Sequence, residues 1–246
     1  MRLDETNMGG QEKAFSETVS DLVSGLRSPE AGRYTAAFDV FCGNYWKPVY
    51  AYVRTAWAKG NEEAKDLTQA FFLWLAESEA LRKFEPARGS LRRYLRVLLR
   101  SFVGHQEEAL GRHKRGGASK HLSLDTGPSE LEDVLTDPRS PDPEAAYDRA
   151  WSATVLGHAI RRLGDRCAAE GRLDAYLLFE NYDLRPDAVR PTYKDLAAKF
   201  RVDETEVRKR LLEMREALRT EIRGELSRYA VGEGDLESEW SFLFTS

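Results

Sequence analysis

Apolar residues recur at helical spacing along this chain, and no segment shows the alternation of apolar and polar residues that is typical of a strand. Between residues 34 and 58 the apolar side chains return every three or four positions. They are Phe38, Phe41, Tyr45, Val49, Tyr52 and Val53. Gly60 and Asn61 then interrupt the pattern before a second periodic run begins. The pattern predicts an all-α protein whose first helical block covers residues 15–110.

The run 63–75 has two faces of different character. At about 100° per residue, one face collects the apolar side chains Ala64, Leu67, Phe71, Trp74 and Leu75. The opposite face carries Asp66, Gln69, Ala70 and Leu73. An ordinary surface helix of this length would show more charge. We therefore expect the first face to be buried and the second to bind a partner protein.

An arginine-rich helix follows a break at residues 84–89, and Ser90 is a suitable N-cap for it. Its apolar stripe consists of Leu91, Leu95, Leu98, Leu99 and Phe102. An adjacent arc carries Arg92, Arg93, Arg96 and Arg100. Four guanidinium groups on one face repel one another, so an anionic partner would stabilise them. Phosphate is the natural candidate, because arginine binds it in a bidentate fork.

The surroundings of this helix favour single-stranded nucleic acid as the partner. An aromatic side chain and further basic groups add stacking and positive charge, and they are Tyr94, His113, Lys114 and Arg115. The alternative is a solvated arginine face that is paired with nearby Glu. Acids are nearly absent from the helix itself, which favours the nucleic-acid interpretation.

A Pro-rich, acidic stretch separates this block from a second helical block at 144–224. Pro128, Pro138, Pro141 and Pro143 fall within residues 124–143, which predicts a flexible tether. Further on, residues 192–200 form a short helix, and Arg201 and Val202 a turn. Asp203 then caps a longer helix, with Glu206 at its third position.

A short helix, a tight turn and a longer capped helix are typical of a helix-turn-helix, with a plain helical hairpin as the alternative. Basic side chains of the longer helix could face a DNA groove, namely Arg208, Lys209, Arg210, Arg215 and Arg219. The acids Glu204, Glu206, Glu213, Glu216 and Glu221 weaken this interpretation. Like charges near phosphate reduce affinity.

The amino-acid composition narrows the possible classes of protein. The chain has 246 residues, of which 41% are hydrophobic and 32% charged, and no apolar run is long enough to span a membrane. The N-terminus has no signal segment, and Cys42 and Cys167 form no CxxC pair, so we expect a cytoplasmic protein. No histidine has metal-ligand spacing, and no phosphate-binding or nucleophile motif is present. We therefore expect no enzyme, no cofactor, no metal and no small-molecule substrate.

The net charge of −4 hides two opposite blocks. Residues 88–120 contain nine Lys or Arg and two acids, for a charge of +7. Residues 125–148 contain eight acids and one Arg, for a charge of −7. The basic block suits a polyanion, and the acidic block suits a solvated linker.

The order of these parts resembles a bacterial extracytoplasmic-function sigma factor, the minimal specificity subunit of RNA polymerase. Residues 66–72 look like the core-polymerase-binding motif of the family. Residues 88–95 look like its promoter-melting segment, with Tyr94 where an aromatic residue is usual. The resemblance covers residues 33–224.

Two further stretches narrow the resemblance. Residues 114–117 and 122–125, and their spacing to 193–197, are similar to a subgroup common in planctomycete-like bacteria. The chain departs from the family pattern at three positions. The family usually has Asn where Ser101 stands and Asp or Asn where His105 stands, and an acid often replaces Ala70. Its recognition helix is also usually more basic than residues 204–219.

The resemblance implies two small helical domains joined by a flexible acidic linker, the second with the helix-turn-helix. The implied ranges are 14–117 for the first domain, 118–145 for the linker, 146–224 for the second domain and 225–246 for an acidic-aromatic tail. Core RNA polymerase and promoter DNA are the implied partners, and an anti-sigma protein is a further candidate. No membrane partner is implied.

The resemblance also assigns residues to each contact. The clamp helices of the largest polymerase subunit would bind Asp66, Gln69, Ala70 and Leu73. The minus-ten element would contact Arg92, Arg93, Tyr94, Arg96, Arg100, Ser101, His105, Arg112, Lys114 and Arg115. The minus-thirty-five element would contact Tyr193, Lys194, Thr205, Glu206, Arg208, Lys209, Arg210 and Arg215.

Two alternatives to a sigma factor stay open. One is a degenerate sigma-like or helix-turn-helix regulator that binds DNA or polymerase without initiating transcription. The other is a helical protein that only binds other proteins.

The tail combines acids with the apolar residues Trp240, Phe242, Leu243 and Phe244. It could fold back on the protein or dock on a partner and regulate access, or it could form a turn packed on the second domain.

Overall fold

The computed structural model describes residues 21–57, 60–113, 142–185 and 190–245. All regular structure in these residues is helical, which confirms the all-α class. Within them, no helix combines the length and the apolar character needed to cross a membrane. The elements are α1 Asp21–Leu26, α2 Ala31–Trp57, α3 Asn61–Glu77, η1 Ala80–Lys83, η2 Pro86–Arg88, α4 Leu91–His113, α5 Pro143–Ala169, α6 Leu173–Asp183, α7 Tyr193–Phe200, α8 Glu204–Leu226 and α9 Glu233–Thr245.

Local signals set the helix boundaries where the sequence predicts them. Gly60 is the N-cap of α3, and the hydroxyl of Ser90 accepts a hydrogen bond of 3.4 Å from the amide of Arg93 at the start of α4. Thr192 and Asp195 form a reciprocal capping box on α7. The side chains of Ser90 and Thr192 each satisfy an amide group that the first turn of a helix leaves without a partner.

Arg201 ends α7 in the left-handed region, with φ of 54°. Asp203 then caps α8 by accepting a hydrogen bond of 2.8 Å from the amide of Glu206, as the sequence predicts. The two helices are therefore joined by a turn of three residues, 201–203. The buried stripe of α8 includes Val207, Leu211, Met214 and Ile222.

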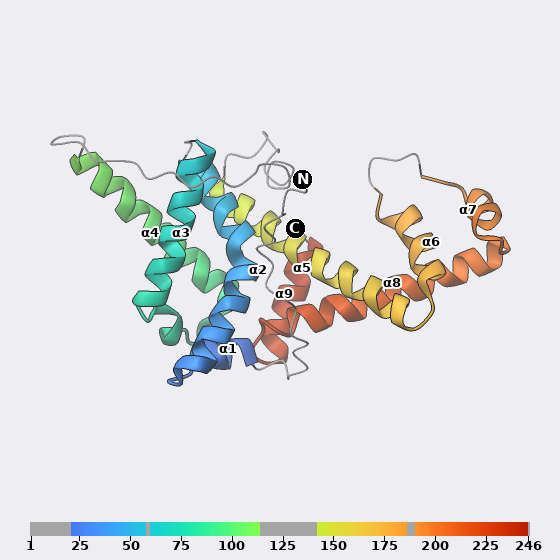
Figure 1. Ribbon diagram of the computed structural model, residues 1–246, viewed down its shortest axis with the longest axis horizontal. Helices are drawn as coiled ribbons and strands as arrows, with labels where there is room; N and C mark the ends of the chain where they lie inside the picture. Colours follow the sequence, from blue (N-terminus) through green and yellow to red (C-terminus); the bar gives the residue numbers. More distant parts are fainter. Residues whose placement is uncertain (1–20, 58–59, 114–141, 186–189, 246) are drawn as a thin grey trace, which may run out of the picture.

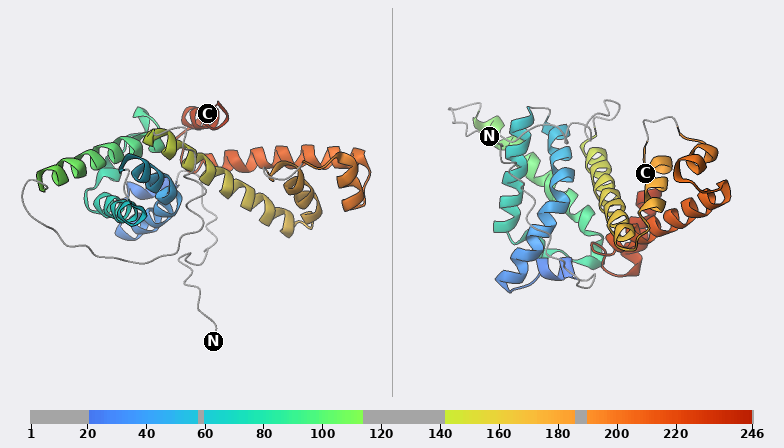
Figure 2. Two further views of the ribbon diagram at one scale, coloured as in Figure 1. Left: turned by 90° about the horizontal axis from the view of Figure 1, so that it is seen from above. Right: turned by 45° about the vertical axis from the view of Figure 1, so that its right-hand side comes forward.

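Two large hydrophobic clusters organise the described residues into two lobes. The first lobe consists of α1–α4, α9, the first half of α5 and the end of α8. The second lobe consists of the rest of α5, α6, α7 and the first half of α8. Figure 1 shows α5 and α8 side by side, running from one lobe to the other. Figure 2 shows the same arrangement from two further directions.

The two cores do not follow the predicted domain ranges. Tyr147, Trp151 and Val155 of α5 belong to the core of the first lobe, although residues 146–224 were assigned to the second domain. The reason is that the apolar stripe of α5 continues along a helix of 27 residues, so that its two ends enter different cores. Most of the predicted linker, 118–145, lies outside the described residues. Its last part is helical, because Asp142 caps α5.

A buried carboxylate joins α5 to α8 beside residues of the first core. Glu225 of α8 is 1% exposed, and its Oε1 lies 2.9 Å from Nδ1 of His158. The hydroxyl of Tyr229 donates to the same oxygen at 2.8 Å, and Arg162 donates to the other oxygen. Burial alone would raise the pKa of Glu225, but the hydrogen bonds of His158 and Tyr229 and the charge of Arg162 together lower it.

Candidate functional site

The two faces of α3 lie as the sequence predicts. Ala64, Phe71 and Leu75 are buried in the first core. Leu67 and Trp74 pack against the same core from its edge. The side chains of the opposite face, Asp66, Gln69, Ala70 and Leu73, are all exposed.

The exposed face of α3 forms a single stripe, because its residues are spaced by three or four positions. Leu73 is 61% exposed within this stripe, which is a large exposure for an apolar side chain. Phe72 is on the buried side, where its ring stacks on Trp46 at 5.7 Å between centroids. The core therefore fixes the rotation of α3, and the stripe is presented on a rigid element.

The arginines of α4 form a ladder of ion pairs with α5. Arg92 donates from Nη1 to Oδ1 of Asp148 at 2.5 Å, and Arg96 donates from Nη1 to Oδ2 of the same carboxylate at 2.7 Å. Glu144 continues the ladder, with its Oε2 3.5 Å from Nε of Arg96 and its Oε1 3.1 Å from Nη1 of Arg100. The partners are four residues apart on each helix and run in opposite directions.

Arg92 has a second carboxylate partner from α9. Its Nε donates to Oε2 of Glu239 at 2.7 Å, and its Nη2 donates to Oε1 at 3.3 Å. The side chains of Arg92 and Glu239 are only 3% and 2% exposed. The guanidinium also lies 3.7 Å from the ring centroid of Phe242 and 4.9 Å from that of Trp151. Arg92 is thus enclosed by α5 and α9. We call Arg92, Asp148, Glu239 and Phe242 the clasp.

The clasp keeps its arginine charged. Burial alone would lower the pKa of Arg92, but the hydrogen bonds and charge of Glu239, together with the charge of Asp148, raise it. Three carboxylates, those of Glu144, Asp148 and Glu239, therefore neutralise three guanidiniums of α4 in this structure.

These contacts correct the sequence-based interpretation of α4. We expected Arg92, Arg96 and Arg100 to lack acidic partners, since acids are nearly absent from their own helix. The partners come instead from residues 44 to 147 positions further along the chain. Arg92 in particular is not on an accessible face, because α9 covers it. The alternative of paired arginines describes these three side chains better, although the acids are distant in sequence.

The other residues assigned to the minus-ten element are arranged differently. Arg93, Ser101 and His105 are exposed on α4. Tyr94 is half-buried, with its ring 5.3 Å from that of Phe84 and its hydroxyl donating to the carbonyl of Ala80 at 2.7 Å. Tyr94 is therefore held in the core edge and is not presented for stacking on a base. The side chain of Arg112, and residues 114 and 115, lie outside the described part of the chain.

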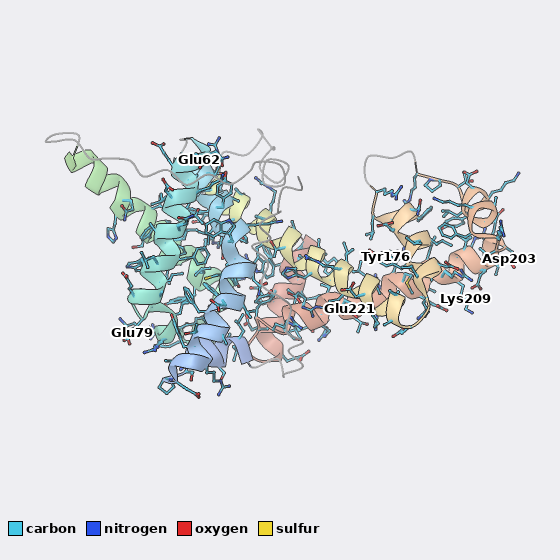
Figure 3. The ribbon with its side chains drawn as sticks, viewed as in Figure 1. Glu62, Glu79, Tyr176, Asp203, Lys209 and Glu221 are labelled. Carbon is cyan, nitrogen blue, oxygen red and sulfur yellow. The ribbon has the colours of Figure 1, made fainter. Side chains whose placement is uncertain are left out.

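The residues assigned to the minus-thirty-five element lie on the second lobe. Lys194, Thr205, Arg208 and Lys209 are exposed, and Figure 3 shows Asp203 and Lys209 at the end of the molecule opposite α3, where Glu62 is labelled. The remaining assigned side chains are half-buried, namely Tyr193, Glu206, Arg210 and Arg215.

Two of these basic side chains have close acidic partners. Arg215 donates two hydrogen bonds to Asp183 of α6, at 2.9 and 3.1 Å. Arg210 donates to Glu206 at 2.8 Å on its own helix. The exposed Arg208 and Lys209 have looser ion pairs, at 3.8 and 4.0 Å. The positive charge that is most available on α8 therefore comes from the latter pair.

Neither metal-ligand clusters nor an activated thiol appear in the described part of the chain. No group of three or more His, Cys, Asp or Glu there could hold a metal ion. Burial raises the pKa of the Cys42 thiol to about 12, so this thiol stays protonated at neutral pH.

Sequence reasoning missed Glu144, Asp148 and Glu239 as structural partners of α4. A signal was present, because the basic block of +7 is followed by an acidic block of −7. Glu144 and Asp148 are also spaced by four residues, like Arg92 and Arg96. No comparable signal marked Glu239, whose contact depends on where α9 packs.

Comparison with protein-family models, with curated proteins and with solved structures finds no match to this chain.

Proposed function

We propose that this chain is a sigma-type subunit that binds core RNA polymerase and directs promoter recognition and melting. The observation that carries the proposal is the stripe on α3. Asp66, Gln69, Ala70 and Leu73 are exposed on a helix whose opposite face is buried, so a partner protein has a rigid surface to bind.

The second lobe supports the DNA-binding part of the proposal. The short helix α7, the turn at 201–203 and the longer α8 have the order and lengths of a helix-turn-helix, in which the second helix enters the major groove. Exposed Lys194, Arg208 and Lys209 would contact phosphate there. The stripe on α3 and this surface lie on different lobes, so both partners could be bound at once.

One observation favours the alternative, a regulator that binds polymerase or DNA without initiating transcription. Arg92, Arg96 and Arg100, which would hold the melted minus-ten element, are paired with carboxylates. Opening a promoter would require these pairs to be exchanged for phosphate. A protein that keeps them would still bind polymerase through α3.

The test of the proposal is transcription and binding with purified core polymerase. Asp66→Ala should weaken binding to core polymerase by about tenfold or more, because it removes the charged side chain of the stripe. Asp39→Ala is the matched control, since Asp39 is an exposed acid on α2 outside the stripe. Equal affinity of the two variants would contradict the role of α3.

Promoter opening separates the two functions. The wild-type protein with core polymerase should yield run-off transcripts from genomic DNA and make thymines of the promoter reactive to permanganate. Binding to polymerase without transcripts or reactive thymines would support the non-initiating regulator.

A further inference from the structure

We propose that α9 is an internal competitor for nucleic acid, and that it must leave the clasp before Arg92 can bind phosphate. This inference rests on the proposed function of α4 as a nucleic-acid-binding helix. The carboxylate of Glu239 occupies the bidentate position on Arg92 that a phosphate group would occupy.

Because the guanidinium of Arg92 is buried under α9, it cannot contact α9 and a phosphate group at the same time. Arg92 is covered by the ring of Phe242, and the ring of Trp151 lies beside it, 6.0 Å from that of Phe242. A phosphate cannot approach a guanidinium that is 3% exposed without removing part of this cover. Asp148 belongs to the long helix α5, whose Trp151 and Val155 are in the core, whereas α9 is a separate short helix. Separating α9 from the first core should therefore cost less free energy than separating α5 from it.

Few side chains of α9 are fully buried. Leu236 and Glu239 are buried, Trp240, Phe242 and Leu243 pack half-buried against the first core, and Phe244 is 54% exposed. At its start, Glu233 and Glu237 pair with Arg223 of α8 on the surface, where ion pairs contribute little. Glu239 and Phe242 are thus the contacts through which α9 closes over Arg92.

The same contacts explain how release would be driven. An unpaired charge in a buried site is costly, so a change at Glu239 leaves Arg92 with Asp148 alone, and this cost is relieved when α9 moves away. A polyanion supplies replacement partners for Arg92, Arg96 and Arg100 in the open state. Nucleic acid and α9 should therefore oppose each other thermodynamically, in both directions.

Three full-length variants test this competition. Glu239→Gln removes the charge that pairs with Arg92, and Phe242→Ala removes the ring that covers it without changing the charge. Glu237→Gln is the control, because it makes the same chemical change on the exposed face of α9. The control also accounts for the general effect of removing one negative charge on binding to a polyanion.

Two measurements are made on each variant. Hydrogen exchange of the α9 amides reports whether the helix is released, and exchange of the α2 and α3 amides reports whether the first core is intact. Fluorescence anisotropy with a labelled single-stranded oligothymidine reports affinity for nucleic acid. We expect Glu239→Gln and Phe242→Ala to speed exchange in α9 and to lower the Kd by about tenfold. Glu237→Gln should resemble the wild type.

The outcomes separate this inference from the proposed function. Faster exchange in α9 with an unchanged Kd, or no faster exchange in either clasp variant, would overturn the role of α9 while leaving the proposed function in place. Absence of oligonucleotide binding and of polymerase binding in every variant would overturn the proposed function, and the inference with it. Addition of oligothymidine to the wild type should itself speed exchange in α9, and unchanged exchange at saturation would contradict the competition.

Discussion

Nδ1 of His158 lies 2.9 Å from Oε1 of Glu225, and this contact joins α5 to α8 beside the first core. The carboxylate also accepts hydrogen bonds from Tyr229 and Arg162. A single buried acid of α8 therefore holds two side chains of α5 that are 67 and 63 residues away in the sequence, as well as Tyr229. Its removal should affect the whole molecule and not one surface.

Glu225→Ala should lower the free energy of unfolding by about 1–3 kcal/mol, because it leaves the buried hydroxyl of Tyr229 without its acceptor and Arg162 without its carboxylate partner. Urea denaturation followed by circular dichroism measures this loss. Glu216→Ala is the control, since Glu216 forms an exposed pair with Arg219, and it should cost less than about 1 kcal/mol. Similar losses in the two variants would contradict a structural role for Glu225.

The lowered pKa of Glu225 also predicts how stability depends on pH. A carboxyl whose pKa is lower in the folded state than in the unfolded state stabilises the fold at pH values above its ordinary pKa, here 4.5. That stabilisation is lost as the pH falls below this value and through the lower pKa of the folded state. Between pH 7 and pH 3.5 the wild type should therefore lose more stability than Glu225→Gln. An equal decrease in the urea midpoint of unfolding for the two proteins over this pH range would contradict the prediction.

Arg96→Ala combined with Arg100→Ala should leave binding to core polymerase unchanged and impair promoter opening by about tenfold or more. The reason is that these two guanidiniums would hold the separated strand once their carboxylate partners are displaced. Permanganate reactivity of promoter thymines measures opening. The control removes two exposed arginines of α5, Arg149 and Arg161, and should open promoters normally. Normal opening in the α4 variant would argue against the assigned role.

Lys209→Ala should weaken binding to duplex DNA uniformly across sequences, and it should reduce the salt dependence of binding by about one counterion. Lys209 is exposed at the outer end of α8 and has only a loose partner, at 4.0 Å. Anisotropy titrations over a range of salt concentrations measure both effects. Lys47→Ala, an exposed lysine of α2, serves as the control. If the affinity of Lys209→Ala for DNA depends on salt concentration as steeply as that of the wild type, this would contradict a contact between Lys209 and DNA phosphate.

Local features of the chain were predicted well because their causes are local. The period of apolar residues in α3 and α8 decides which face is buried, and short-range hydrogen bonds that Ser90, Thr192 and Asp203 accept from backbone amides decide where three helices begin. The exposed stripe of α3 follows from the same period, since a helix that buries one face must present the other.

The candidate nucleic-acid face of α4 was predicted less well. Helical spacing correctly places Arg92, Arg96 and Arg100 close to one another along the helix, but it says nothing about which acids meet them. The ladder to Glu144 and Asp148 needs α5 to pack on α2 so that its first turns come within reach of the arginines of α4, and this depends on Tyr147 and Trp151 entering the first core. The position of α9 likewise depends on packing that no local pattern contains.

The sequence by itself determined the helices, their caps and their buried faces, because these depend on residues a few positions apart. Only the tertiary structure decided that the charge of Arg92 is enclosed, because its partner Glu239 lies 147 residues away. The reason is physical: the free energy of a charged side chain depends on the groups that surround it in space. The same arginine on the same helix could face solvent, a phosphate or a carboxylate, and the packing of α5 and α9 selects the carboxylate.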